Sequence, residues 1–140
     1  MSSNIDKKQV TFYFIFRHEA RDIIRNATRA SEHDRVLFVG NGATGAFSKL
    51  IHSLDLTLPP VVFVCPFLHH SSLLPWREIG AEVVRILETK DGEIDLDNLE
   101  DMLQEYQDNH SGQLIGCFSA ASNITGTIVD DVKITKLLHR

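Results

Sequence analysis

The sequence predicts an α/β fold of three layers, in which a mostly parallel sheet carries helices on both faces. From residue 36 onward, short apolar runs alternate with segments whose apolar residues recur at helical spacing. The runs are apolar throughout, which is typical of strands buried on both faces of a parallel sheet. A glycine-rich turn follows the first run. Ligands of such sheets bind at the carboxyl ends of strands, where this turn lies.

The elements can be placed in order along the chain. A first helix is predicted from about residue 17 to 30, because Ala20, Ile23 and Ala27 share one face. The alternation then predicts strands at 36–39, 61–64, 82–87 and 113–119, and helices at 43–54, 71–79, 95–106 and from about 131. Asp95 and Asp130 stand where acidic residues cap helices.

Composition limits the classes of partner. At 140 residues the chain is long enough for one domain with a sizeable core. A net charge of −5 without a basic block argues against nucleic acid and against a membrane surface as partners. Cys65 and Cys117 each lie in an apolar run, which predicts buried, reduced thiols and a cytoplasmic or other reducing compartment. The apolar run at 10–16 continues into Arg17 without a cleavage site, so we expect no secretory signal.

The glycine turn, VGNGATG at residues 39–45, is the first candidate site. Gly40, Gly42 and Gly45 allow positive φ angles and a close approach of the backbone to a ligand. The amides that begin the next helix favour an anion. Two interpretations follow: a phosphate monoester held by these amides and the Thr44 hydroxyl, or a tight turn without a ligand.

Two other phosphate motifs fit the turn less well. The glycine spacing matches a dinucleotide pattern, but the strand at 61–64 ends in Cys65–Pro66, without the acidic residue that holds a ribose. A nucleoside triphosphate loop needs Lys and then Ser or Thr after the last glycine, where Ala46 and Phe47 stand. The dinucleotide stays an alternative, whereas the triphosphate loop is excluded.

Two further strand ends carry polar residues. His69 and His70 could ligate a metal, cap the next helix, or place one imidazole flat on an aromatic ligand ring. No third ligand has a recognisable metal spacing, so we predict no metal site. In the segment 119–126, turn chemistry alone would explain the small polar residues, or Asn123 would offer its amide to a ligand oxygen.

Taken together, these segments resemble the pyridoxal-phosphate enzymes of the class V aminotransferase group, of the cysteine desulfurase and selenocysteine lyase type. The resemblance is carried, in matching order and spacing, by GNGATGA at 40–46, HHSSLLPWRE at 69–78 and SAASNITG at 119–126. It implies a type I PLP-transferase fold, present only in part. We expect an N-terminal tail or strand at 1–16 and the N-terminal half of the PLP-binding large domain at 17–140.

The resemblance also implies a site for pyridoxal 5'-phosphate. Gly42, Ala43 and Thr44 would hold the phosphate, through backbone amides and the hydroxyl. His69 would stack on the pyridine ring, and Asn123 would bind its phenolic oxygen. In that group the carboxylate that pairs with the ring nitrogen and the lysine that binds the cofactor come later than the segment matched here. No catalytic residue is therefore expected within these 140 residues.

The expected function is that of the cofactor-binding portion of a PLP-dependent transferase or lyase. Its partner would be a small-molecule amino acid such as cysteine or selenocysteine, and the full-length protein would be a homodimer. We expect the 140-residue chain to be inactive by itself. Two alternatives remain: a catalytically inactive binding or regulatory module of the same fold, and a nucleotide-binding oxidoreductase domain.

Overall fold

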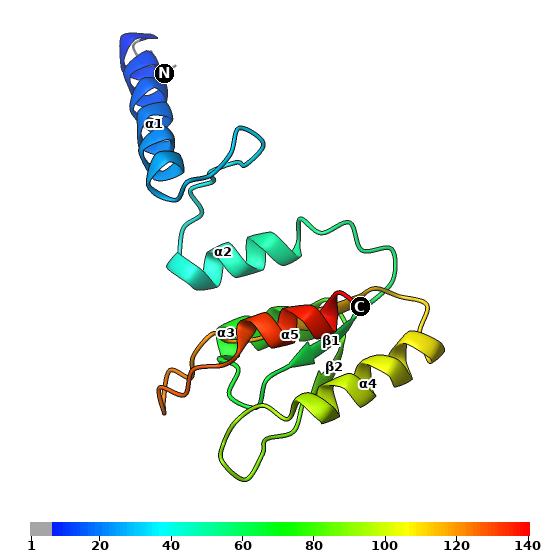
Figure 1. Cartoon of the computed structure of the whole chain (residues 1–140). Helices are drawn as coiled ribbons and strands as arrows, with labels where there is room; N and C mark the ends of the chain where they lie inside the picture. Colours follow the sequence, from blue (N-terminus) through cyan, green and yellow to red (C-terminus); the bar gives the residue numbers. More distant parts are fainter. Residues whose placement is uncertain (1–6) are drawn as a thin grey trace. The chain divides into compact units, whose positions relative to one another are not determined.

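The computed structural model describes the backbone of residues 7–140 and the side chains of residues 11–140. The chain divides into two compact units, residues 1–39 and residues 40–140. Its elements are, in order, α1 (Lys7–Ala27), α2 (Gly42–Ile51), β1 (Val61–Val64), α3 (His70–Glu78), β2 (Glu82–Arg85), α4 (Leu96–Asn109), β3 (Leu114–Cys117) and α5 (Asp131–Leu138) (Figure 1).

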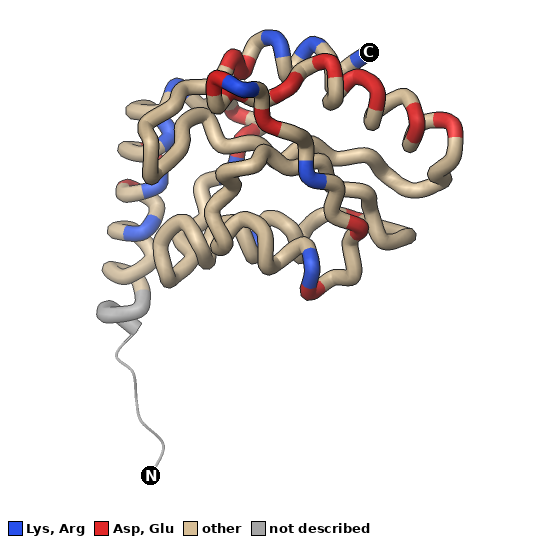
Figure 2. Tube along the Cα trace, turned by 90° about the horizontal axis from the view of Figure 1, so that it is seen from below, with Lys and Arg blue, Asp and Glu red and all other residues tan. Residues whose placement is uncertain are grey.

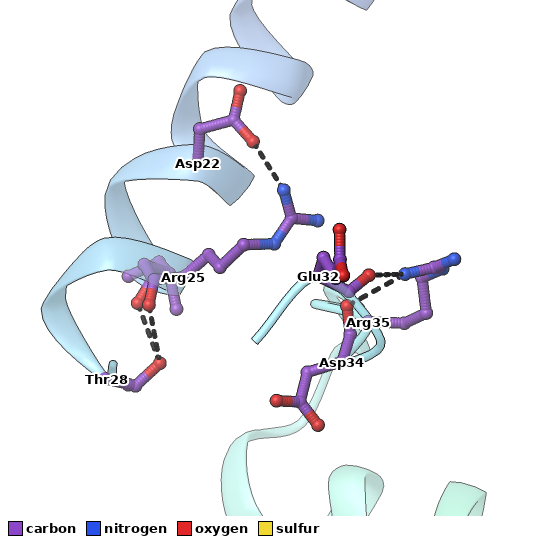
Figure 3. Close-up of polar contacts among 7 residues, drawn as sticks. Asp22, Arg25, Thr28, Glu32, Asp34 and Arg35 are labelled. Carbon is purple, nitrogen blue, oxygen red and sulfur yellow. Dashed lines mark hydrogen bonds and ion pairs between the residues drawn. The ribbon is translucent and has the colours of Figure 1, made fainter. Parts of the chain in front are cut away.

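The first unit contains α1, whose end is organised by local polar contacts. The Arg25 guanidinium pairs with the Asp22 carboxylate at 2.9 Å, and the Thr28 hydroxyl donates to the Ile24 carbonyl at 2.9 Å (Figure 3). Arg29 then takes a positive φ of 54°, which ends the helical path. None of the helices in the described part of the chain is long and apolar enough to cross a membrane.

A turn of polar residues follows α1 within the same unit. The Asp34 carboxylate accepts hydrogen bonds from the Ser31 amide at 2.7 Å and the Ser31 hydroxyl at 2.9 Å. These two bonds hold the pKa of Asp34 below its usual range. The Arg35 guanidinium donates to the Glu32 carbonyl at 2.7 Å (Figure 3). The turn is therefore held by its own side chains.

Two sequence-based expectations for this unit differ from the structure. Residues 36–39 do not form the expected strand, and Leu37 and Phe38 are at least half exposed. A strand needs a neighbour to pair its amides and carbonyls, and the described residues of this unit contain no second strand. Residues 7–16, expected as a tail or strand, are helical, while residues 1–6 lie outside the described part. The domain boundary at residue 17 stays a prediction.

The second unit is built on a parallel three-stranded sheet in the order β2-β1-β3. Val61 lies opposite Glu82 on one side and Leu114 on the other. All four residues of β1 are completely buried, as their uninterrupted apolar run predicts. The strand expected at 61–64 is confirmed. The other two strands start within one residue of their predicted positions and end two residues earlier.

One face of this sheet is covered by α4 and α5. Val61 and Phe63 of β1 belong to the same buried cluster as Leu99 of α4, which has no exposed surface. Ile134 of α5 completes the contact. These side chains recur at the spacing of strands and helices respectively, so the cluster follows from the hydrophobic pattern of the sequence.

The opposite face is covered by α2 and α3. Val62 and Val64, which alternate with the residues of the first face, pack with Ile51 of α2 and Trp76 of α3. The rings of Phe47 and Trp76 meet edge to face, with centroids 6.1 Å apart, and so join α2 to α3. Helices therefore lie on both faces of a parallel sheet, which confirms the predicted three-layer α/β architecture.

The two cysteines lie on opposite faces of this sheet. Cys65 belongs to the cluster beneath α4 and α5, and Cys117 to the cluster beneath α2 and α3. Both are buried free thiols, as predicted, and burial raises the pKa of Cys117.

The predicted helix caps are also present. The Asp95 carboxylate accepts from the Asn98 amide at 3.0 Å, and the Asp130 carboxylate accepts from the Lys133 amide at 3.0 Å. The Lys133 amide and ammonium groups hold the pKa of Asp130 below its usual range. Both caps are local, which is why the sequence alone could predict them.

Tyr106 ties α4 to β2 and makes the stability of the fold sensitive to alkaline pH. Its hydroxyl donates to the Glu82 carboxylate at 2.6 Å, and its ring meets Phe63 edge to face. The bond to the carboxylate raises the pKa of Tyr106 above its ordinary value of 10.0. The folded state therefore holds the phenol proton more tightly than the unfolded state does. The stabilisation is present below that ordinary value and is lost as pH rises through the folded pKa.

We therefore expect the thermal unfolding midpoint of the wild-type protein to fall more steeply in this alkaline range than that of Tyr106→Phe. The variant keeps the ring packing and lacks the titrating hydroxyl, so it is its own packing control. Parallel pH profiles for the two proteins would contradict the expectation.

Candidate functional site

The glycine turn begins α2 and leaves the first amides of the helix without a side-chain cap. Asn41, at the N-cap position, has a φ of 63°, and its side chain makes no capping hydrogen bond. Gly42 follows with a φ of 58°. The Gly45 amide donates to the Asn41 carbonyl at 3.3 Å and closes the first turn. The amides of residues 42–44 stay outside the helical ladder, where an anion could accept from them.

The space around the turn fits a ligand that approaches the backbone. A Cβ added at Gly45 would lie 2.1 Å from the Gly40 carbonyl oxygen, so this position accepts only glycine without rearrangement. At Gly40 and Gly42, a Cβ would meet nothing within 4 Å. Open space beside unpaired amides, with the Thr44 hydroxyl in the same exposed turn, suits a phosphate group.

The unit that contains the glycine turn carries a negative net charge, so the amides at the start of α2 are the main attraction that it offers to an anion. Residues 40–140 contain seven Lys and Arg and fourteen Asp and Glu, a net charge of −7. The acidic residues of α4 form a run along that helix, which has no basic residue (Figure 2): Asp97, Glu100, Asp101, Glu105 and Asp108. The general field of this unit therefore repels anions, and any anion preference comes from the helix amides.

His69 is the N-cap of α3. Its Nδ1 accepts from the Ser71 amide at 3.1 Å and lies 2.7 Å from the Ser71 hydroxyl oxygen. The capping interpretation is therefore confirmed for the first of the two histidines. Capping uses only one edge of the ring, and His69 as a whole is exposed.

Asn123 lies at the exposed tip of a tight loop after β3. Ser122, only 5% exposed, organises this loop: its amide donates to the Thr127 carbonyl at 2.9 Å. Its hydroxyl oxygen accepts from the amides of Ile124 at 3.3 Å and Thr125 at 3.2 Å. Turn chemistry thus explains the small polar residues of this segment. It also presents the Asn123 side chain to solvent.

The segments of His69 and Asn123 leave the sheet at the same edge. β1 and β3 are parallel with Val64 opposite Cys117, so the chains that follow them start side by side. The Ser119 amide donates to the Cys65 sulfur at 3.5 Å, directly linking the two exits. The glycine turn belongs to α2, which packs on α3. That all five residues form one site stays a prediction.

A groove of about 710 Å³ lies along the open edge of β3, between α4 and α5. Leu114, Ile115 and Leu138 line it, and the five candidate residues do not. The candidate residues instead occupy exposed surface of the described chain.

Two serines that support the candidate residues carry no distinctive signal in the sequence. Ser71 contacts the His69 ring, and Ser122 holds the loop around Asn123. Serines in loops often bind backbone amides one or two positions away, so the presence of a serine does not by itself mark a supporting residue. Only the structure shows which groups they contact.

The chain is similar in sequence and in fold to proteins that are already known. The family described as aminotransferase class-V matches residues 3–140. A probable cysteine desulfurase of Halalkalibacterium halodurans is 27% identical over 128 residues, which are 86% of this chain and 30% of that protein. The crystal structure of mouse CSAD aligns with a TM-score of 0.51 and 14% identity, over 69% of this chain and 22% of that one, and so supports the fold alone. The chain spans less than a third of each relative. Since the family match covers nearly its whole length, the chain belongs to the class-V aminotransferase family.

Proposed function

We propose that this chain is the cofactor-binding portion of a pyridoxal-phosphate enzyme acting on an amino acid. The observation that carries the proposal is the glycine turn, whose uncapped amides begin α2 beside open space. Membership of a family of PLP-dependent enzymes supports it. The similarity to a probable cysteine desulfurase makes cysteine, or a selenium analogue, the first substrate to test.

Each candidate residue has a distinct role in this proposal. The amides of Gly42, Ala43 and Thr44, with the Thr44 hydroxyl, would bind the phosphate. His69 would lay the face of its imidazole on the pyridine ring, and Asn123 would donate its side-chain amide to the phenolic oxygen. Bound pyridoxal phosphate supplies an electron sink for bonds at the α-carbon of an amino acid. The residues of this chain bind and orient the cofactor.

For the whole protein we propose a homodimer in a reducing compartment, in which the residues that carry the chemistry lie outside this segment. The 140-residue chain would then bind the cofactor without turning over substrate. An assay of the chain with pyridoxal phosphate and cysteine tests this point, and release of sulfide above a cofactor-only blank would contradict it.

Replacing Thr44 with valine should weaken binding of pyridoxal phosphate by about tenfold or more. The variant keeps the shape of the side chain and removes a hydrogen bond to a charged group, which is worth roughly 1.5–3 kcal/mol. Equilibrium dialysis of the 140-residue chain measures the dissociation constant. Thr57→Val is the matched control, because Thr57 lies in an exposed loop before β1.

Three further titrations separate this binding from general lysine chemistry. Inorganic phosphate should compete with pyridoxal phosphate, and pyridoxal without its phosphate should bind far more weakly. A titration with NAD tests the dinucleotide alternative. Equal dissociation constants for wild type and Thr44→Val, or saturable binding of NAD alone, would refute the proposed phosphate site.

A further inference from the structure

We propose that Ser71 positions His69, by fixing both the tautomer and the rotation of its imidazole ring. The identity of the ligand that this ring would meet rests on the function proposed above. The geometry of the ring does not, because it follows from contacts within the chain.

Two groups of Ser71, its backbone amide and its hydroxyl, converge on one nitrogen of His69. The Ser71 backbone amide lies 3.1 Å from Nδ1, and the Ser71 hydroxyl oxygen lies 2.7 Å from it. A backbone amide can only donate, so Nδ1 must carry its lone pair toward Ser71. The ring proton then belongs on Nε2.

The opposite tautomer would disturb the start of α3. A protonated Nδ1 could still donate to the Ser71 hydroxyl, but the Ser71 amide would lose its partner. That amide is one of those at a helix start without an intrahelical acceptor, and His69 is the residue that caps it. The cap and the tautomer are therefore coupled.

The same contacts restrain the rotation of the ring. Turning the imidazole about its Cβ–Cγ bond would take Nδ1 away from both Ser71 donors at once. One edge is thus held against the first turn of α3, within a residue that is exposed as a whole. A ligand that fits this arrangement has an aromatic ring to stack on the face and an acceptor atom near Nε2.

This contact also distinguishes the two adjacent histidines. Ser71 holds the ring of His69, whereas no hydrogen bond of the His70 ring occurs among the described side chains. Residue types and spacing alone did not distinguish the two rings, and only the family resemblance favoured His69. The structure assigns that role to His69.

The test is nuclear magnetic resonance of the full 140-residue chain with ¹⁵N-labelled histidine and no cofactor. In the wild type, His69 should show an unprotonated Nδ1, a protonated Nε2 and a single side-chain rotamer. Ser71→Ala removes the hydroxyl donor and should give averaged rotamers. Ser71→Thr keeps the hydroxyl and should restore the wild-type signals. Ser72→Ala alters the neighbouring serine, whose side chain makes no hydrogen bond to the ring, and should change nothing.

Binding of pyridoxal phosphate provides the second readout. Ser71→Ala should weaken it by about two- to tenfold, the worth of one ordinary hydrogen bond, and Ser71→Thr should restore it. A protonated Nδ1 in the wild type, or a single unchanged rotamer in Ser71→Ala, would overturn the assignment of Ser71. If the rotamer responds as expected but the wild type binds no cofactor, the assignment stands and the proposed function fails.

Discussion

Replacing Gly45 with alanine is expected to abolish binding of pyridoxal phosphate and to destabilise the start of α2. The new Cβ would lie 2.1 Å from the Gly40 carbonyl oxygen, which is a backbone atom and cannot rotate away. The turn must therefore open, and the amides of residues 42–44 would lose their common direction. Several hydrogen bonds to a charged group would be lost together. The dissociation constant for pyridoxal phosphate should therefore rise by about a hundredfold or more, which is beyond detection for a weak site.

Two neighbouring glycines provide matched controls. Gly40→Ala places a Cβ in open space at an ordinary φ, so binding and stability should stay near wild type. Gly42→Ala also has open space but a φ of 58°, which should cost about 1 kcal/mol of stability and a smaller part of the affinity. If Gly45→Ala bound the cofactor as well as Gly40→Ala, the close approach would not be what shapes the site.

Truncating Leu99 to alanine should lower the free energy of unfolding by about 3 kcal/mol. Leu99 of α4 has no exposed surface and packs in the cluster that covers β1. Its truncation removes buried methyl groups and leaves a cavity in a region that close packing prevents from collapsing. Urea denaturation followed by circular dichroism measures the loss, with the slope of the transition expected to stay constant.

Leu87→Ala is the control, since it makes the same chemical change at a side chain that is 59% exposed. It should shift the free energy of unfolding by no more than about 0.5 kcal/mol. Equal losses in the two variants would mean that the cluster around Leu99 is not the core of residues 40–140.

Local patterns in the sequence were sufficient for most of the fold. The uninterrupted apolar run at 61–64 is a strand buried on both faces. Successive side chains of a strand point to opposite faces, so a run that is apolar throughout is typical of a parallel sheet covered by helices on both sides. Asp95 and Asp130 cap the helices they precede, because a cap involves amides only three residues away. Helical periodicity likewise placed α2 to α5 to within a few residues.

The candidate site was predictable only as separate segments. The family resemblance assigned roles to Thr44, His69 and Asn123, but it did not identify the serines that support two of these residues. Ser71 and Ser122 have no distinctive pattern, since a serine hydroxyl forms short-range bonds in many loops. Their importance depends on which neighbour the folded backbone brings within hydrogen-bonding distance.

The sequence by itself therefore determined the order of strands and helices, the buried faces and the helix caps of residues 40–140, since these follow from hydrophobic period and local hydrogen bonding. The tertiary structure decided what depends on residues far apart in the chain. Residues 36–39 have the composition of a strand, but the described residues of their unit, 7–39, contain no strand to pair with, and so they form none. Cys117 ends β3 opposite Val64 of β1, whereas Cys65 comes one residue after Val64. The two thiols therefore face opposite sides of the sheet, because strand pairing and register are interactions between distant segments.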